Sequence, residues 1–271
     1  MQHIESRQNP RLREVARLIA SSRDRRKAQR CVLEGAHLIG VYCDRGSVPE
    51  TLVVVDDMAG RPEIAGLVAR VAASRVLAVS RSLFTEIATM PPEVGALAVV
   101  ASPHLTSAPP GRFCLLLEDL QDPGNVGTML RTAAAAGVDQ VLLSRHCAFA
   151  WSPKVLRAGQ GAHFLTTIVE DVDLVAWSRE FRAGGGRVVA TVVRDGQSLH
   201  ATDLAGPLAI AIGNEGSGLS AAFLACADLR VTIPMAPGSE SLNAAAVAAV
   251  MLFESLRQRG AKRQARLGSN Q

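Results

Sequence analysis

The sequence has few aromatic residues, few cysteines and no long apolar segment. Aromatic residues make up 4% of its 271 residues, so stacking of bases on aromatic side chains is not the nucleic-acid binding mode that the composition favours. The five cysteines are odd in number, scattered and never in C-x-x-C spacing. This pattern predicts neither a disulfide framework nor a metal site, and it favours a reduced, cytoplasmic location.

The longest apolar run, AAAVAAVMLF at residues 244–253, is far shorter than the roughly 20 residues that a membrane span requires. The first ten residues contain no apolar core of the kind that secretory signals have. We therefore expect no membrane association. The composition, 48% hydrophobic and 20% charged residues, is that of an ordinary globular protein.

Positive charge is concentrated at the two ends of the chain. Residues 1–30 carry nine Arg and Lys against three acids (+6), and residues 257–271 carry five against none (+5). Because the whole chain sums to +4, the middle carries −7. Basic ends on a slightly acidic body suit a polyanion such as nucleic acid. The alternative is that both ends are solvated tails.

Short runs of Val, Ile and Leu alternate with helical patterns along the whole chain. This alternation predicts an α/β fold with a mostly parallel, doubly wound sheet. In the first part, strands are predicted at 31–35, 51–57, 75–80 and 96–102, and helices at 10–20, 35–45, 62–72 and 81–88. In the second part, strands are predicted at 113–120, 140–144, 164–169, 187–193, 208–214 and 229–235, and helices at 125–136, 153–159, 172–183, 219–226 and 242 to about 258.

A proline-rich stretch, SPHLTSAPPG, separates the two parts and predicts a linker. The expected organisation is an N-terminal α/β domain at 1–102, a linker at 103–111, a second domain at 112–260 and a basic tail at 261–271.

Three polar loops of the second domain each follow a predicted strand and lead into a helix. They are EDLQDPGNVGTMLRT (118–132), GNEGSGLS (213–220) and IPMAPGSESLN (233–243). Ligands of an open parallel sheet bind beyond the carboxyl ends of its strands, so we expect these loops to converge.

The first loop places Asn125 at the head of a helix and Arg131 six residues later, about 240° around it, so the two cannot share a face. Asn125 is either a plain N-cap or a site residue. Arg131 stands alone in the apolar stretch VGTMLRTAAAAGV. It is either a surface cation or a cation with a partner, such as a phosphate or a carboxylate across an interface.

In the second loop, Gly213, Gly216 and Gly218 allow close approach of a ligand or positive φ. The loop lacks the Lys-Ser/Thr of a P-loop, and Glu215 would repel a phosphate. It is therefore predicted to receive a neutral or cationic group or ribose hydroxyls, unless it is a glycine-rich turn with a solvated glutamate.

The third loop places Ser239, Ser241 and Asn243 around the start of an alanine-rich helix. Ser241 as the helix N-cap is the simpler interpretation, and it is compatible with a role in the site. The helix is apolar on nearly all sides, which predicts burial or packing against a second subunit.

Together, DPGNVGTMLRTAAAAG, AIGNEGSGLS and VTIPMAPGSESLNAAAVA resemble the three signature motifs of the SpoU (TrmH-like) RNA ribose 2′-O-methyltransferases, in the same order. The N-terminal part resembles, in architecture only, the small α/β RNA substrate-binding domain that many members carry. The resemblance implies a SPOUT-type fold, in which the C-terminal parallel-sheet domain contains a trefoil knot, and a homodimer with the active site near its interface.

The resemblance also implies S-adenosyl-L-methionine as the methyl donor. Its main-chain contacts would come from Gly213, Ile233 and Leu242, with Thr191 and Met235 nearby. One departure is Pro237, where relatives more often have a shorter or more polar lead-in. It puts the shape of the third loop in doubt but none of the matched polar residues.

The central catalytic role falls by resemblance to Arg131, which would engage an RNA phosphate and assist deprotonation of the ribose hydroxyl, often from the partner subunit. A 2′-hydroxyl is a poor nucleophile at neutral pH, and arginine is not a conventional base. Asn125, Glu215, Ser241 and Asn243 match polar positions that line the site and orient the ribose or Arg131.

The predicted activity is methyl transfer to a ribose 2′-hydroxyl of RNA, with ribosomal RNA as the first substrate candidate and transfer RNA as the alternative. A knotted methyltransferase that modifies a base or another target is a second interpretation. A catalytically silent RNA-binding assembly factor is a third, but such a protein has no chemical reason to keep the full set of polar site residues.

Overall fold

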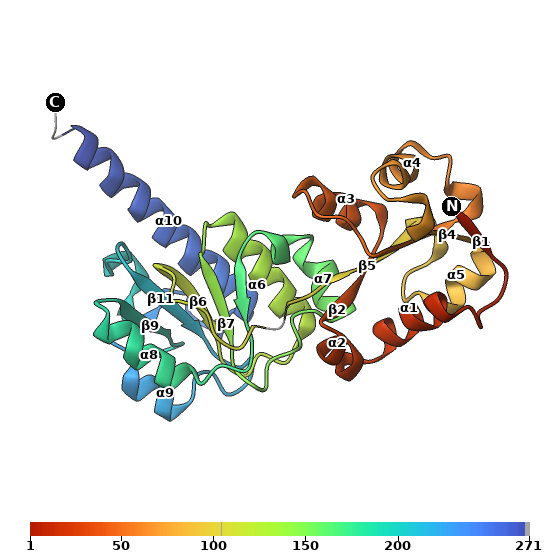
Figure 1. Ribbon diagram of the computed structural model, residues 1–271. Coiled ribbons are helices and arrows are strands. Elements are labelled where there is room, and N and C mark those ends of the chain that lie inside the picture. Colours follow the sequence, from red (N-terminus) through yellow and green to blue (C-terminus); the bar gives the residue numbers. More distant parts are fainter. Residues whose placement is uncertain (104, 269–271) are drawn as a thin grey trace. The chain divides into compact units, whose positions relative to one another are not determined.

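The computed structural model describes residues 1–103 and 105–268, with side chains described up to residue 261 (Figure 1). The chain forms two compact units. Unit 1 contains Met1–His104 and Trp151–Phe164, and unit 2 contains Leu105–Ala150 and Leu165–Gln271. Residues 151–164 therefore belong to unit 1 although they follow the first strands of unit 2, an excursion that no sequence pattern indicates.

Unit 1 is built on a five-stranded sheet with the order β1-β4-β3-β5-β2. Strands β1, β4 and β3 are parallel, whereas β5 is antiparallel to both β3 and β2. The strands are β1 (Gln2–Ile4), β2 (Arg30–Glu34), β3 (Thr51–Val55), β4 (Val76–Val79) and β5 (Ala96–Ala101).

Helices cover both faces of this sheet (Figure 1). One face packs against the apolar sides of α1 and α5, and the fully buried Phe84 of α5 belongs to that core. The helices of unit 1 are α1 (Pro10–Ala20), α2 (Ser22–Ala28), α3 (Ala36–Asp44), α4 (Pro62–Ala69), α5 (Arg81–Ile87) and α7 (Pro153–Gly159).

Helix α7 is attached to the rest of unit 1 by a buried ion pair. Arg157 Nη1 lies 3.3 Å from Glu34 Oε1, and the Glu34 side chain is 1% exposed. The same carboxylate accepts hydrogen bonds from the Thr89 backbone N–H (2.8 Å) and hydroxyl (2.6 Å). A buried carboxylate needs several such partners, so these bonds explain why α7 is held against β2.

Unit 2 is built on a seven-stranded sheet that is parallel throughout, with the order β10-β12-β9-β11-β6-β7-β8. Strand β11 pairs with both β6 and β9, although both precede it in the chain. The strands are β6 (Phe113–Leu117), β7 (Gln140–Leu143), β8 (Thr167–Val169), β9 (Arg187–Thr191), β10 (Gln197–Ser198), β11 (Leu208–Ile212) and β12 (Leu229–Thr232).

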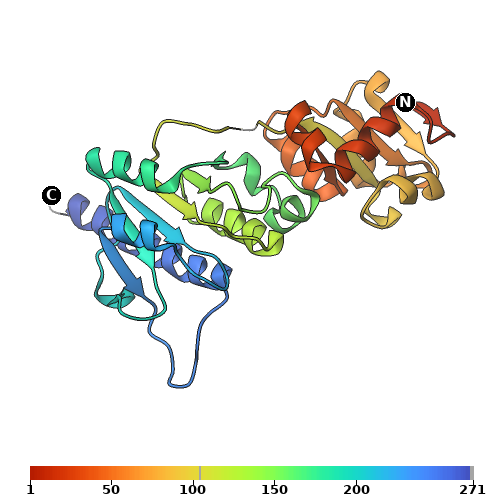
Figure 2. The same cartoon turned by 90° about the horizontal axis from the view of Figure 1, so that it is seen from below.

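Helices α8 (Leu174–Ala183) and α9 (Ala221–Cys226) cover one face of the sheet, and α6 (Pro123–Ala135) and α10 (Ala244–Gly268) pack together on the other (Figure 1). This confirms the expected doubly wound α/β arrangement. The segment between β12 and α10 projects from the unit as an extended loop (Figure 2). Within the described residues, no helix is both long enough and apolar enough to cross a membrane.

The predicted helices and strands are present, with three additions and several shifted boundaries. The strand predicted at 164–169 begins only at Thr167, because Ala162–Phe164 forms a 3₁₀ turn. Strands β1 and β10 are too short to show a pattern, and α2 (SRDRRKA) has no apolar periodicity. Helix α10 runs to Gly268 rather than ending near 258, because the basic stretch after Leu256 is rich in Arg, Gln, Lys and Ala, all good helix formers. Most of the predicted basic tail, 261–271, lies outside the residues whose side chains are described.

Candidate active site

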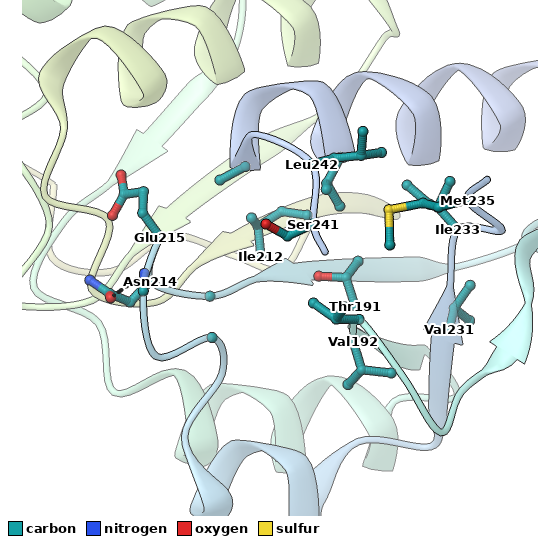
Figure 3. Close-up of a pocket in the computed structure, with 16 residues that line it drawn as sticks. Thr191, Val192, Ile212, Asn214, Glu215, Val231, Ile233, Met235, Ser241 and Leu242 are labelled. Carbon is teal, nitrogen blue, oxygen red and sulfur yellow. Dashed lines mark hydrogen bonds between the residues drawn. The ribbon is translucent and has the colours of Figure 1, made fainter. Parts of the chain in front are cut away.

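A cavity of about 200 Å³ opens at the carboxyl ends of β9, β11 and β12 (Figure 3). Asn214 and Glu215 lie at one end of it, and Ile233 and Met235 lie at the other (Figure 3). No described lining residue is a lysine or arginine, and one is a carboxylate. The lining residues are Thr191, Val192, Val193, Ile212, Gly213, Asn214, Glu215, Gly216, Gly218, Val231, Ile233, Met235, Ser241, Leu242, Ala244 and Val247.

All five residues predicted to contact a cofactor line this cavity: Thr191, Gly213, Ile233, Met235 and Leu242. Thr191 is the last residue of β9, and its hydroxyl donates to the Ala211 carbonyl oxygen at 2.8 Å. Leu242 is 41% exposed, an apolar side chain at the rim of the cavity.

The loop after β11 can form only with glycine at position 213. A Cβ atom there would lie 2.2 Å from the carbonyl carbon of Gly218 and 2.2 Å from the nitrogen of Leu219. The loop closes through two backbone hydrogen bonds between Asn214 and Gly218, of 3.1 and 2.9 Å. Gly218 has φ +71°, the left-handed region that favours glycine.

Hydrogen bonds of two side chains, Glu118 and Asn214, attach this loop to the end of β6. Glu118 accepts hydrogen bonds from the Ser220 backbone N–H and hydroxyl, both at 2.7 Å. Asn214 Nδ2 donates to the Asp119 carbonyl oxygen at 2.8 Å. The Ser220 hydroxyl also accepts from the Phe223 N–H at 3.1 Å, which caps α9. Ser220 thus fixes the loop and starts the next helix.

Glu215 connects the second loop to the first. Its carboxylate accepts from the backbone N–H groups of Gln121 (3.3 Å) and Asp122 (3.2 Å) and from Asn125 Nδ2 (3.1 Å). Partial burial opposes the negative charge, but these hydrogen bonds outweigh it and lower the pKa of Glu215 below its usual value. The carboxylate is therefore occupied with holding α6 and is charged at neutral pH.

Asn125 and Asn243 join the first and third loops. Asn243 Nδ2 donates to Asn125 Oδ1 at 3.1 Å, which completes a chain of side chains from Glu215 to α10. Asn243 Oδ1 accepts from the N–H groups of Ala245 (2.8 Å) and Ala246 (3.3 Å). Asn243 is therefore the N-cap of α10, so the interpretation of Ser241 as that cap is wrong.

Asn125 is also not a helix cap. The N-cap of α6 is Asp122, whose side chain accepts from the Asn125 N–H at 2.7 Å, and Pro123 occupies the first helical position. The Asn125 side chain is thereby left to bridge Glu215 and Asn243. Ser241 is exposed and lines the cavity.

Arg131 lies on α6 outside this network. Its side chain is exposed, it does not line the cavity, and it forms no hydrogen bond or ion pair with any residue of the described ranges. Of the five predicted catalytic residues, the structure thus brings together Asn125, Glu215 and Asn243 by hydrogen bonds and Ser241 by the shared cavity, and leaves Arg131 apart.

Sequence reasoning did not single out Glu118, Asn214 or Ser220, which hold the second loop in place. The available signal was position. Glu118 comes directly after a buried parallel strand and Asn214 comes two residues after another, at the edge of the sheet where ligands bind. It also missed Val192 and Val193, which line the cavity from the segment after β9.

Both parts of the chain are similar to known protein families. Residues 112–253 match the SpoU rRNA Methylase family, and residues 9–98 match the MRM3-like substrate binding domain. The 23S rRNA (guanosine(2553)-2′-O)-methyltransferase RlmP of Bacillus subtilis is 31% identical over 254 residues, which covers 93% of this chain and 98% of RlmP. A protein of Synechocystis named as an uncharacterized tRNA/rRNA methyltransferase is 34% identical over 261 residues, covering 95% and 94% of the two chains.

A solved structure with the same architecture is the SpoU methyltransferase AviRb from Streptomyces viridochromogenes in complex with AdoMet. It has a TM-score of 0.79 and 27% identity, and the similarity covers 93% of this chain and 98% of AviRb. The family match covers more than half of the present chain, and RlmP is similar over nearly its full length. The chain therefore belongs to the SpoU rRNA methylase family.

Proposed function

We propose that this protein transfers a methyl group from S-adenosyl-L-methionine to a ribose 2′-hydroxyl of ribosomal RNA. The observation that carries the proposal is one cavity lined by the second and third loops, to which the first loop is joined by the hydrogen bonds of Asn125 with Glu215 and Asn243. Family membership adds the reaction class. The names of relatives such as RlmP favour ribosomal over transfer RNA.

The cavity fits the proposed cofactor. Its backbone cradle at Gly213 leaves no room for a Cβ atom, and its lining lacks the cations that would hold a phosphate. The main chain at Gly213, Ile233 and Leu242 would hold the cofactor, with Thr191 and Met235 beside it. When bound, S-adenosyl-L-methionine supplies an electrophilic methyl group on a positively charged sulfur. Glu215 places a negative charge at one end of this cavity.

Arg131 is proposed to bind the phosphate next to the target ribose and to assist removal of the hydroxyl proton. Its exposed guanidinium has no intramolecular partner among the described residues, so it is available for an RNA phosphate. Asn125, Glu215, Ser241 and Asn243 would orient the ribose or Arg131. Because arginine stays protonated in proteins, its contribution would be to stabilise negative charge as the proton leaves.

The active protein is proposed to be a homodimer in which Arg131 serves the cavity of the partner. Two observations support this. Arg131 lies apart from the cavity of its own chain, and α10 exposes Val250 (41%), Phe253 (48%) and Leu256 (39%) at helical spacing. A stripe of three exposed apolar side chains suits a helix that packs against a second copy.

Three further features are proposed on the basis of the family. The chain after β9 would be threaded as a trefoil knot, which is compatible with the late insertion of β11 between β6 and β9. The domain limits would be 1–102 for substrate binding, 103–111 for the linker, 112–260 for methyl transfer and 261–271 for the basic tail. A ribosomal RNA substrate would place the protein in the cytoplasm.

The test is transfer of labelled methyl from S-adenosyl-L-methionine to unmodified ribosomal and transfer RNA, followed by nuclease digestion and mass spectrometry of the nucleosides. A 2′-O-methylated nucleoside from ribosomal RNA is expected. Methylation of transfer RNA alone would change the substrate, and a base-methylated product would overturn the ribose assignment. No transfer to free RNA or to partly assembled ribosomal particles, with cofactor binding intact, would favour a silent assembly factor.

The role of Arg131 is tested in the same assay. Arg131→Ala is expected to lower kcat by about 10²–10³ while the cofactor Kd stays unchanged. Arg179→Ala is the matched control, because Arg179 is an exposed arginine of α8 with no hydrogen bond or ion pair to a described residue. Equal turnover of the two variants would remove Arg131 from the mechanism.

A further inference from the structure

The first two helices carry four cationic side chains that are exposed and have no partner in the described part of the chain. Arg13 and Arg17 on α1, and Arg23 and Lys27 on α2, form no hydrogen bond or ion pair with any residue that the structure describes. Within each helix the two cations are four residues apart, so they are neighbours on one face, about 5–6 Å apart at their Cβ atoms. Like charges at this spacing repel each other and destabilise an isolated helix.

Some exposed arginines of unit 1 have carboxylate partners, whereas Arg45, Arg61 and Arg75 have none among the described residues and, unlike the four cations above, are scattered over the unit. Arg70 lies 2.6 Å from Asp44, and Arg81 lies 2.7 Å from Asp57 and 3.2 Å from Glu93. The charge of these arginines is offset locally, whereas that of the α1 and α2 cations is not. The difference is not one of exposure, because the side chains of Arg70 and Arg81 are 48% and 41% exposed.

Helix α2 is held against α1 by its one buried arginine, Arg25, and not by its exposed cations. Arg25 is 5% exposed, and its Nη1 donates to the carbonyl oxygens of Leu18 (2.6 Å) and Ile19 (2.8 Å) in the last turn of α1. Ser21, the single residue between the helices, accepts from the Asp24 N–H at 3.2 Å and caps α2. A short and strongly basic helix is thus fixed against α1 without using the charges of Arg23 or Lys27.

We infer that the exposed side of α1 and α2, defined by Arg13, Arg17, Arg23 and Lys27, is the surface through which unit 1 binds the phosphate backbone of the RNA substrate. The inference rests on the proposed function for the identity of the polyanion. Neither helix contains an aromatic residue, so this surface contacts phosphates and does not stack bases. It supplies affinity and orientation, and sequence selection lies elsewhere.

The inference is tested by the salt dependence of RNA binding. The full-length protein is titrated into a fluorescein-labelled RNA hairpin of mixed sequence, and Kd is measured by anisotropy between about 50 and 200 mM KCl. Neutralising all four cations in R13Q/R17Q/R23Q/K27Q is expected to reduce the slope of log K against log[salt] by about 3. Over that salt range, four contacts of this kind correspond to a roughly 50- to 150-fold change in affinity.

The matched comparison uses variants that each remove two positive charges from unit 1. R13Q/R17Q and R23Q/K27Q are each expected to reduce the slope by about 1.5. R70Q/R81Q, which neutralises paired arginines, is expected to leave it nearly unchanged. Equal effects of the three double variants would mean that only the net charge of the protein matters for RNA binding. An unchanged slope in the quadruple variant would mean that the four side chains are solvated and do not contact RNA. Either outcome overturns the inference.

Kinetics separate this inference from the proposed function. In the methyl-transfer assay the quadruple variant is expected to raise the KM for RNA while keeping kcat and the cofactor Kd, because its substitutions lie far in sequence from the cavity residues. If the wild type transfers no methyl group, the proposed function fails, and the salt slopes still test the surface. If transfer occurs and both KM and slope are unchanged, the surface fails and the function stands.

Discussion

Because Gly213 has no side chain, the loop after β11 can fold back on itself. A Cβ atom at this position would lie 2.2 Å from two backbone atoms of Gly218 and Leu219, neither of which can move away as a flexible side chain could. At Gly216, by contrast, an added Cβ would meet only Asn214 Oδ1, at 3.6 Å. Substitution of Gly213 by alanine therefore introduces a clash with the backbone, and substitution of Gly216 in the same loop is the matched control.

Gly213→Ala is expected to weaken cofactor binding by roughly 5- to 150-fold, since forcing atoms into a packed site costs about 1–3 kcal/mol. Gly216→Ala is expected to change the Kd less than about twofold, because its new contact is an ordinary one. Isothermal titration with S-adenosyl-L-methionine measures both. Similar affinities in the two variants would show that closure of this loop does not shape the cofactor site.

Glu215 is expected to make cofactor binding at the proposed site depend on pH in one direction. Its pKa is lowered from the usual 4.5, so the carboxylate stabilises the loop contacts above that pH and loses this contribution as the pH falls through its lowered folded value. We expect the cofactor Kd to be flat from neutral pH down to the ordinary glutamate range and to rise only below it. Glu215→Gln should bind more weakly at neutral pH and lose this dependence. A wild-type Kd that already rises well above pH 4.5 would contradict the assignment.

At the scale of elements, Ser220 joins the second loop to both β6 and α9. It caps α9 through Phe223 N–H and donates to Glu118, whereas Ser80 caps α5 through Leu83 N–H at 3.2 Å without touching the site. Each serine is replaced by alanine as a matched pair. Both variants should lose about 1 kcal/mol of stability from the missing cap.

Only Ser220→Ala should also weaken cofactor binding, because it removes one of the two hydrogen bonds that hold Ser220 to Glu118. Chemical denaturation and titration calorimetry separate the two effects. A cofactor Kd that is unchanged in Ser220→Ala would mean that the hydrogen bonds of Asn214 and Glu215 suffice to hold the loop.

Elements with a regular apolar pattern could be predicted from the sequence, and the expected helix at 10–20 coincides with α1. Helix α2 could not, because it depends on Arg25 reaching two carbonyl groups of a neighbouring helix. The three site loops could be placed at one edge of the sheet. Their caps could not be assigned, because Asp122, Asn125, Ser241 and Asn243 are all good N-cap types and the choice depends on the backbone path of each loop.

At the scale of the whole molecule, the exposed side of α10 decides the proposed assembly. Phe253→Glu places a charge among Val250, Phe253 and Leu256 and is expected to convert the protein to a monomer in light-scattering measurements, with loss of turnover and retention of cofactor binding. Val48→Glu is the control, since Val48 is equally exposed (48%) but lies in unit 1. A wild type that is monomeric and active would overturn the homodimer.

Subunit mixing tests whether Arg131 acts across the interface. One protomer carries Arg131→Ala and keeps an intact cavity, and the other carries Gly213→Ala and keeps Arg131. Co-expressed with two different tags and assayed at a cofactor concentration below the Kd of Gly213→Ala, the mixed dimer is expected to turn over faster than either parent. Inactive mixed dimers would mean that Arg131 acts on the cavity of its own protomer.

Strand β11 is central in the sheet of unit 2 but late in the sequence, and this limits when the sheet can assemble during synthesis. Strands β6 and β9 are both synthesised before residues 208–212, which separate them in the finished sheet. Until then each has an unpaired edge of the kind that can pair with another chain. The cavity is lined by residues up to Val247, so it can assemble only when nearly the whole chain has been synthesised. A nascent chain released before β11 is expected to pair β6, β7 and β8 and to leave β9 without a partner strand, because the other neighbour of β9, β12, also comes after β11.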